Sequence, residues 1–278
     1  LDTLIPEEFK STIPEESRLR YLYIKNFLGQ KFIRTSRVHR LFEALGYNLV
    51  SNNSGHSLTR PSSTSLADAL FGSINEFEET LLARSVAQPV IDLVSKESGA
   101  TAMQLSRWSR VTSALNKLVD VSRFRGPKFV FYHILSPHEP FSFDREGNSI
   151  PPHSVYDYSP WMQDKLEKPG YLDWFKINYP INVEGLNVHL KKMVRRLLES
   201  TEGKAVIIIQ SDHGSSLGLT SQIPWENDLV ERFGIMNAIY LPPEYGEIEI
   251  EDNVSAVNTF PLLLGKTLGI EIDTVEDK

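Results

Sequence analysis

The stretch Ala205-Val-Ile-Ile-Ile-Gln-Ser-Asp-His-Gly214 indicates the fold class of this chain more clearly than any other. Its first part, residues 205–210, is a continuous run dominated by β-branched residues. Such a run is typical of a central parallel strand that is covered on both faces, rather than of a half-exposed antiparallel strand. Its second part, residues 211–214, is polar. Because ligands of open α/β sheets bind beyond the carboxyl ends of the strands, we expect the chemistry of the protein here.

Expected strands and helices alternate along the rest of the chain. We predict strands at 47–50, 128–135 and 234–241, and helices at 37–45, 75–94, 102–121, 186–197 and 254–268. Gly46 is expected to end the first of these helices. The alternation predicts a single α/β domain over residues 1–278, a three-layer α/β/α sandwich around a mostly parallel sheet.

The composition excludes several classes of function. The chain has 278 residues and a formal net charge of −7, which argues against non-specific binding of nucleic acid, since that needs a basic face. Cysteine is absent, which excludes disulfides, thiolate zinc sites and cysteine nucleophiles. No stretch approaches the roughly 18 to 20 apolar residues that cross a bilayer. The start at Leu1 lacks an initiator Met, a basic segment and an apolar run, so we expect a part of a longer protein.

Two of the expected strands are followed by residues that suit a metal or an anionic substrate. The strand at 128–135 runs into a segment that contains His138, and the strand at 205–210 runs into Asp212 and His213. A carboxylate and a neutral imidazole are good ligands for a divalent cation. Gly214 is expected to let the chain turn tightly after them.

The same residues carry a family resemblance. Residues 206–214 resemble the Ser-Asp-His-Gly segment of the alkaline phosphatase superfamily, in the branch of sulfatases, lipoteichoic acid synthases and phosphoethanolamine transferases. Residues 129–148 look like the strand of that branch that ends in a His followed by Pro and an aromatic residue. Residues 46–47, 75–82, 231–242 and 254–260 are similar to its other segments, in the right order and over most of the chain.

The resemblance implies a metal-dependent hydrolase or transferase of sulfate or phosphate esters. Asp212 and His213 would then be ligands of a divalent cation (manganese, zinc, magnesium or calcium), and His138 would contact the phosphate or sulfate group. Arg232 is a candidate for binding a substrate oxygen, although a salt bridge to a nearby acid explains it equally well. The partner would be a small-molecule ester or one linked to a lipid or glycan.

The resemblance also implies that part of the site lies outside this chain. The family carries an acidic ligand and a nucleophilic Ser or Thr ahead of its Gly-Tyr segment, and no apolar strand that ends in an acid precedes Gly46. The nucleophile is therefore expected upstream of residue 1, with the sheet incomplete at its amino-terminal edge. Relatives are often tethered by amino-terminal membrane helices, which implies an extracytoplasmic domain that meets the membrane only through a preceding segment.

Three alternatives remain open. Thr59, Ser62 or Ser63 could serve as the nucleophile, but the loop around them is also what an exposed turn looks like. The domain could have kept the fold and lost the site, which would leave a binding or scaffolding role. A nucleotide-binding domain is disfavoured because no Gly-rich phosphate loop follows any strand.

The remaining histidines and aromatic residues carry weaker expectations. We expect His133 to be a packed core residue, Glu139 to be exposed, and His39 and His189 to lie on the surface, with His56 and His153 as minor candidates for substrate contact. Residues 142–179 are expected to form a long irregular connection. Its aromatic residues would form a lid or wall, or simply pack in the loop: Tyr156, Tyr158, Trp161, Tyr171 and Trp174.

Overall fold

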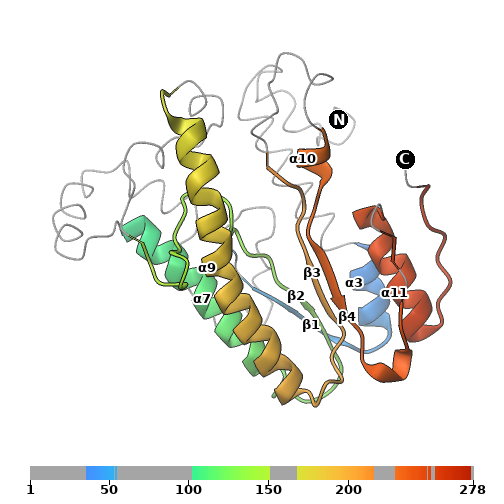
Figure 1. The fold of residues 1–278 in the computed structure, drawn as a ribbon. Helices are drawn as coiled ribbons and strands as arrows, with labels where there is room; N and C mark the ends of the chain where they lie inside the picture. Colours follow the sequence, from blue (N-terminus) through green and yellow to red (C-terminus); the bar gives the residue numbers. More distant parts are fainter. Residues whose placement is uncertain are drawn as a thin grey trace, which may run out of the picture. The chain divides into compact units, whose positions relative to one another are not determined.

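The computed structural model of the chain describes residues 36–52, 54, 102–150, 168–215, 229–248, 250–251 and 254–276 (Figure 1). The expected helix at 75–94 and several single residues lie outside these ranges: His56, Thr59, Ser62, Ser63, His153, Tyr156, Tyr158 and Trp161. The contacts divide the chain into two compact units, which are described one at a time.

Unit 1 comprises the described residues among Leu1–Lys117, Phe124–Pro152 and Asn182–His189. Its sheet pairs β1 (Asn48–Ser51) with β2 (Lys128–Phe131) in parallel, with Leu49 opposite Phe129. Helix α7 (Ala102–Val121), most of which lies in this unit, has the bounds that the sequence predicted. The chain is therefore a mixed α/β protein with a small parallel sheet, as expected in this coarser sense.

Helix α3 (Arg37–Ala44) shows how the sequence builds unit 1 locally. Ser36 caps its start, because the hydroxyl oxygen accepts a hydrogen bond from the backbone N–H of His39 at 3.2 Å. Gly46, in the left-handed region at φ 78°, follows its end and confirms the predicted stop. The ring of Phe42 stacks on that of Phe129 with centroids 4.4 Å apart, so the helix packs against β2.

Unit 2 comprises the described residues among Leu118–Arg123, His153–Ile181 and Leu190–Lys278. Its strands β3 (Ile207–Gln210) and β4 (Asn237–Tyr240) are antiparallel, with Ile207 opposite Tyr240. The short helices η4 (Pro243–Tyr245) and η5 (Ala256–Asn258) follow, and then α11 (Thr259–Leu268). Leu263 and Leu264 of α11 are buried, whereas Leu268 at its end is 37% exposed.

The antiparallel pair departs from the mostly parallel sheet that the sequence indicated. The only helix in the described part of the connection is α10 (Leu229–Phe233), with five residues. It spans about 7.5 Å, whereas a strand of four residues extends about 13 Å. Hydrogen bonds join Ser211 to Met236 at 3.0 Å and 2.9 Å, so the chain returns at the same end of the strand. The apolar run at 205–210 therefore predicted the strand β3 but not that its neighbour β4 would be antiparallel to it.

Helix α9 (Tyr171–Ser200) contains the predicted apolar stripe but begins much earlier than expected. The prediction of an irregular connection up to residue 179 is wrong from Tyr171 onward. Aromatic rings at helical spacing hold this first part: Tyr171 packs with Phe175, which stacks on Tyr179 with centroids 5.2 Å apart. Pro180 lies inside the helix. None of the helices in the described part of the chain has the length and apolar character of a bilayer span.

Candidate functional site

The loop that follows β3 presents a carboxylate and an imidazole to solvent. The Nε2 atom of His213 lies 3.3 Å from Oδ2 of Asp212. The side chains of Asp212 and His213 are 77% and 42% exposed. Oδ1 of Asp212 accepts the backbone N–H of His213 at 3.0 Å, which orients the carboxylate along the loop. Both side chains are thus directed and accessible at the end of a strand, where the sequence placed the chemistry.

Gly214 lets this loop lie against α10 because it has no side chain, and not because it adopts a backbone conformation that only glycine favours. Its φ lies outside the left-handed region, which corrects the expectation of a tight turn. A Cβ atom at this position would lie 1.9 Å from the backbone oxygen of Glu231. The N–H of Gly214 donates to the carbonyl oxygen of Arg232 at 2.7 Å. The glycine is therefore needed because two backbones approach too closely for a side chain.

Arg232 joins the imidazole to this backbone contact. Its NH1 group donates to the carbonyl oxygen of Gly214 at 3.1 Å and lies 2.6 Å from Nδ1 of His213. Arg232 thus contacts the site through His213. From the sequence we expected its partner to be either a substrate oxygen or a nearby acidic residue.

The Nδ1 atom of His213 has two neighbours that require opposite protonation. It accepts a hydrogen bond from Arg232 if it is unprotonated, because guanidinium groups only donate. It donates to the carbonyl oxygen of Gly214, 2.8 Å away, if it carries the proton. In the second tautomer the lone pair of Nε2 is available to a ligand, and a ring N–H to a backbone carbonyl is the usual support of a metal-binding histidine.

The loop that follows β2 is built differently. Glu139 is only 6% exposed, which corrects the expectation of an exposed loop acid. Arg107 of α7 is also buried, and its NH1 group donates to the carbonyl oxygens of His138 and Glu139 at 3.1 Å and 2.7 Å. His138 is exposed, with Nδ1 2.6 Å from the carbonyl oxygen of Glu139. A buried cation thus holds the backbone of this loop.

Asn182 of α9 fixes the next residues of the same loop. Its side-chain oxygen accepts the backbone N–H groups of Ser142 and Phe143 at 3.0 Å and 3.1 Å, and its amide donates to the carbonyl oxygen of Pro137 at 3.3 Å. Asn182 is 1% exposed and Phe143 is fully buried. Residues 139–143 are therefore part of the core of unit 1.

Two histidines expected at the surface pack in unit 1 instead. His189 contacts the carbonyl oxygen of Gly147 at 2.7 Å, and its ring lies edge-on to Trp108. His39 lies edge-on to the rings of Phe129 and Phe131, with centroids 5.3 Å and 6.1 Å away. Burial there lowers the pKa of His39, although the charge of Glu43 acts in the opposite direction.

The predicted site residues thus fall into two groups. Asp212, His213 and Arg232 meet in unit 2, while His138 belongs to unit 1. His133 lies beyond the end of β2, where its backbone N–H donates to the side-chain oxygen of Asn52 at 2.9 Å. No group of three or more possible metal ligands comes together among the described residues.

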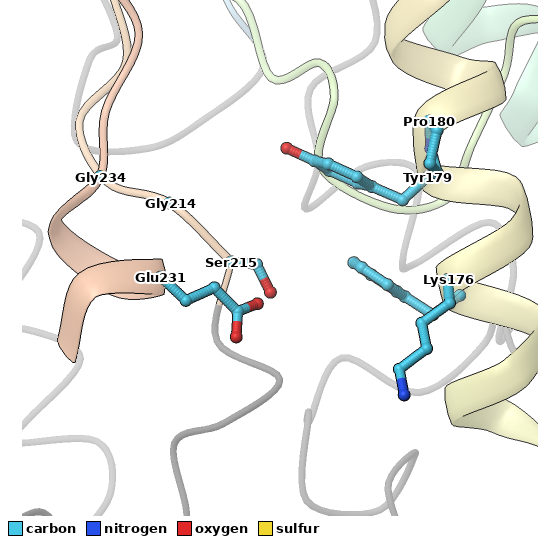
Figure 2. A pocket seen from close by; sticks show the side chains of 8 residues that line it. Lys176, Tyr179, Pro180, Gly214, Ser215, Glu231 and Gly234 are labelled. Carbon is cyan, nitrogen blue, oxygen red and sulfur yellow. The ribbon is translucent and has the colours of Figure 1, made fainter. Parts of the chain in front are cut away.

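A cavity that the sequence did not indicate lies beside the loop after β3. Figure 2 shows Lys176, Tyr179 and Pro180 of α9 on one side and Ser215 and Glu231 on the other. Burial raises the pKa of Tyr179, and the negative charge of Glu231 raises it further, so the phenol stays protonated. The spacing of four residues between Phe175 and Tyr179 is the one sequence signal that could have predicted these rings on the same face of a helix.

No family model, curated protein or solved structure matches this chain. The resemblance to sulfatase-like proteins therefore stays a prediction from the residues that carry it.

Proposed function

We propose that this chain belongs to a metal-dependent hydrolase or transferase of sulfate or phosphate esters, with Asp212 and His213 among the ligands of a divalent cation. The observation that carries the proposal is the exposed pair of donor atoms after β3. Oδ2 of Asp212 and Nε2 of His213 lie 3.3 Å apart. Two ligands of a tetrahedral ion with bonds of about 2.0–2.1 Å lie roughly 3.3–3.4 Å apart. The pair therefore fits two positions of one coordination sphere without rearrangement.

Charge and hydrogen bonding support the same assignment. The carboxylate of Asp212 supplies negative charge to a cation, and its exposure means that no buried partner has to be given up. His213 would bind through Nε2 while Nδ1–H donates to the carbonyl oxygen of Gly214. A bound divalent cation would polarise the ester oxygen that it contacts.

Arg232 gains a role from this arrangement. When Nδ1 of His213 carries a proton, the guanidinium of Arg232 has no acceptor there and can turn its donors to an anionic oxygen of the ester.

The proposal extends to the whole protein. The three-layer α/β/α architecture of the alkaline phosphatase superfamily would include the parallel pair β1 and β2, and the nucleophile and further metal ligands would precede residue 1. The catalytic domain would lie outside the cytoplasm, as in the proteins that the sequence resembles. Manganese, zinc, magnesium and calcium all remain candidates, since carboxylate and imidazole suit several of them.

The test is turnover of p-nitrophenyl phosphate and p-nitrophenyl sulfate by the whole protein, with each metal added after chelation. We expect metal-dependent activity on one of the esters and a loss of at least about 100-fold in kcat/KM for Asp212→Asn. Asp273→Asn changes the charge equally at an exposed position and serves as the matched control. Equal rates for Asp212→Asn and the control would refute the ligand assignment. Absence of turnover with either ester and every metal would favour the binding or scaffolding role.

A further inference from the structure

The cavity beside the loop after β3 has a volume of about 410 Å³ and opens to solvent. This volume lies within the range of small-molecule sites. All of its lining residues belong to unit 2. One wall is the first part of α9, and the other consists of Gly214, Ser215, Glu231 and Gly234 (Figure 2).

The helical wall is apolar and rigid. The rings of Phe175 and Tyr179 stack with centroids 5.2 Å apart and planes inclined by 10°, and Pro180 adds a third ring. Phe175 is 6% exposed, so the stack is anchored in the core of the unit. Rings held in this way offer carbon surface to a ligand with little loss of side-chain entropy on binding.

Polar groups of both kinds surround that apolar wall. Lys176 brings an ammonium group and Tyr179 a protonated hydroxyl, while Glu231 and Ser215 offer a carboxylate and a hydroxyl from the opposite side (Figure 2). An aliphatic chain in the cavity would displace water from the charged groups without replacing its hydrogen bonds, which is costly. An anionic ligand would be repelled by the carboxylate of Glu231, and a cationic ligand by the ammonium group of Lys176. A neutral ring with hydroxyl groups satisfies both the carbon surface and the polar rim.

We infer that this cavity binds a sugar ring, the hydroxylated group to which the sulfate or phosphate of the substrate is attached. Gly214 and Ser215, which line the cavity, directly follow Asp212 and His213 in the loop. The backbone contact between Gly214 and Glu231 fixes the two sides of that wall to each other. A ring in the cavity thus lies against the same loop that carries the carboxylate and imidazole pair. The inference rests on the proposed function for the ester, and selects a glycan over a lipid.

The experiment measures binding to the chain without metal, so that its result is independent of the ligand assignment. Saturation-transfer NMR in buffer with a chelator would compare the methyl glycosides of glucose, galactose and mannose with cyclohexylmethanol and hexanol. We expect transfer to the ring protons of at least one glycoside and weaker transfer to both alcohols. Lys176→Met and Glu231→Leu should each weaken glycoside binding at least about tenfold. Lys191→Met, at an exposed position later in α9, should leave it unchanged.

Glu231→Leu also provides an internal contrast, because it should improve the binding of cyclohexylmethanol while it weakens that of the glycoside. Tyr179→Phe removes only the hydroxyl and keeps the stacked rings, so it reports on the polar contact if larger changes disturb the fold. Binding of the alcohols alone would overturn the inference in favour of a lipid or other apolar group. Glycoside binding that survives Lys176→Met, Glu231→Leu and Tyr179→Phe would overturn the assignment to this cavity.

Discussion

The loops that follow β2 and β3 both carry a histidine next to an acidic residue, but they treat these residues in opposite ways. After β2, Glu139 is buried and the carbonyl oxygens of the loop are held by the buried Arg107. After β3, Asp212 is 77% exposed and the loop is held by backbone contacts with α10. Buried groups that are already hydrogen-bonded stabilise the fold, whereas the exposed and oriented oxygen and nitrogen atoms of Asp212 and His213 remain accessible to a metal ion. We therefore expect metal binding at the loop after β3 rather than at the loop after β2.

The largest expected effect comes from Gly185 of α9, which holds the loop after β2 in place. A Cβ atom there would lie 1.9 Å from the backbone oxygen of Asp144 and 2.7 Å from Cβ of Phe143. Because this loop is part of the core, we expect Gly185→Ala to lower the free energy of unfolding by about 3 kcal/mol. Urea denaturation followed by circular dichroism measures the change.

The matched control is Gly265→Ala in α11, where the nearest atom to a new Cβ would be the backbone oxygen of Ile270 at 3.7 Å. Because the new methyl group has space there, we expect Gly265→Ala to raise the free energy of unfolding by up to about 1 kcal/mol. Similar effects of the two substitutions would contradict the close packing of α9 on the loop.

A second comparison sets Arg107 against Arg232, since each supports one of the loops. Arg107→Met should lower the free energy of unfolding by about 2–3 kcal/mol, because a buried and a partly buried carbonyl oxygen lose a charged donor. Arg232→Met removes a donor from a half-exposed carbonyl and should cost less than about 1 kcal/mol. Equal losses in urea denaturation would remove the structural distinction between the loops.

The pH dependence of stability gives a smaller effect that reports on the packing of His39. Burial lowers the pKa of His39 in the folded chain below the ordinary value of 6.5. The unfolded chain therefore binds a proton more readily, and the stability is complete above pH 6.5 and falls as the pH drops through the lowered pKa. His39→Gln should flatten this fall in thermal melts between pH 7 and 5. A fall in stability that His39→Gln leaves unchanged would contradict the packing of His39 against β2.

Much of the fold could be predicted from local patterns in the sequence. The bounds of α7 were predicted to the residue, and the start of α3 and its end at Gly46 follow from residues close in the chain. The strand predicted at 47–50 is shifted by one residue in β1, whereas the other three strands were predicted too long. β2 ends at Phe131, and the residues after it form the loop that Arg107 and Asn182 hold. Distant side chains decide where that strand stops, and no local pattern contains them.

The missed features share a cause, which is dependence on contacts far along the chain. Glu139 is buried because α7 and α9 cover its loop, and Gly214 is required because Glu231 approaches it from α10. The first part of α9 was not predicted, although its aromatic residues have helical spacing. Asp212 and His213 could be named as candidates from the sequence because they directly follow a strand, which a local pattern reveals.

Titration of the chain with Zn²⁺, followed by the ring nitrogen shifts of His213 in ¹⁵N NMR, tests the central claim most directly. The account predicts that Nε2 of His213 binds the metal while Nδ1 keeps its proton and donates to Gly214. Asp212→Asn should weaken the binding by at least about tenfold, and Asp273→Asn should not change it. Ring nitrogens of His213 that stay unchanged at millimolar Zn²⁺, or equal binding by the two variants, would contradict it.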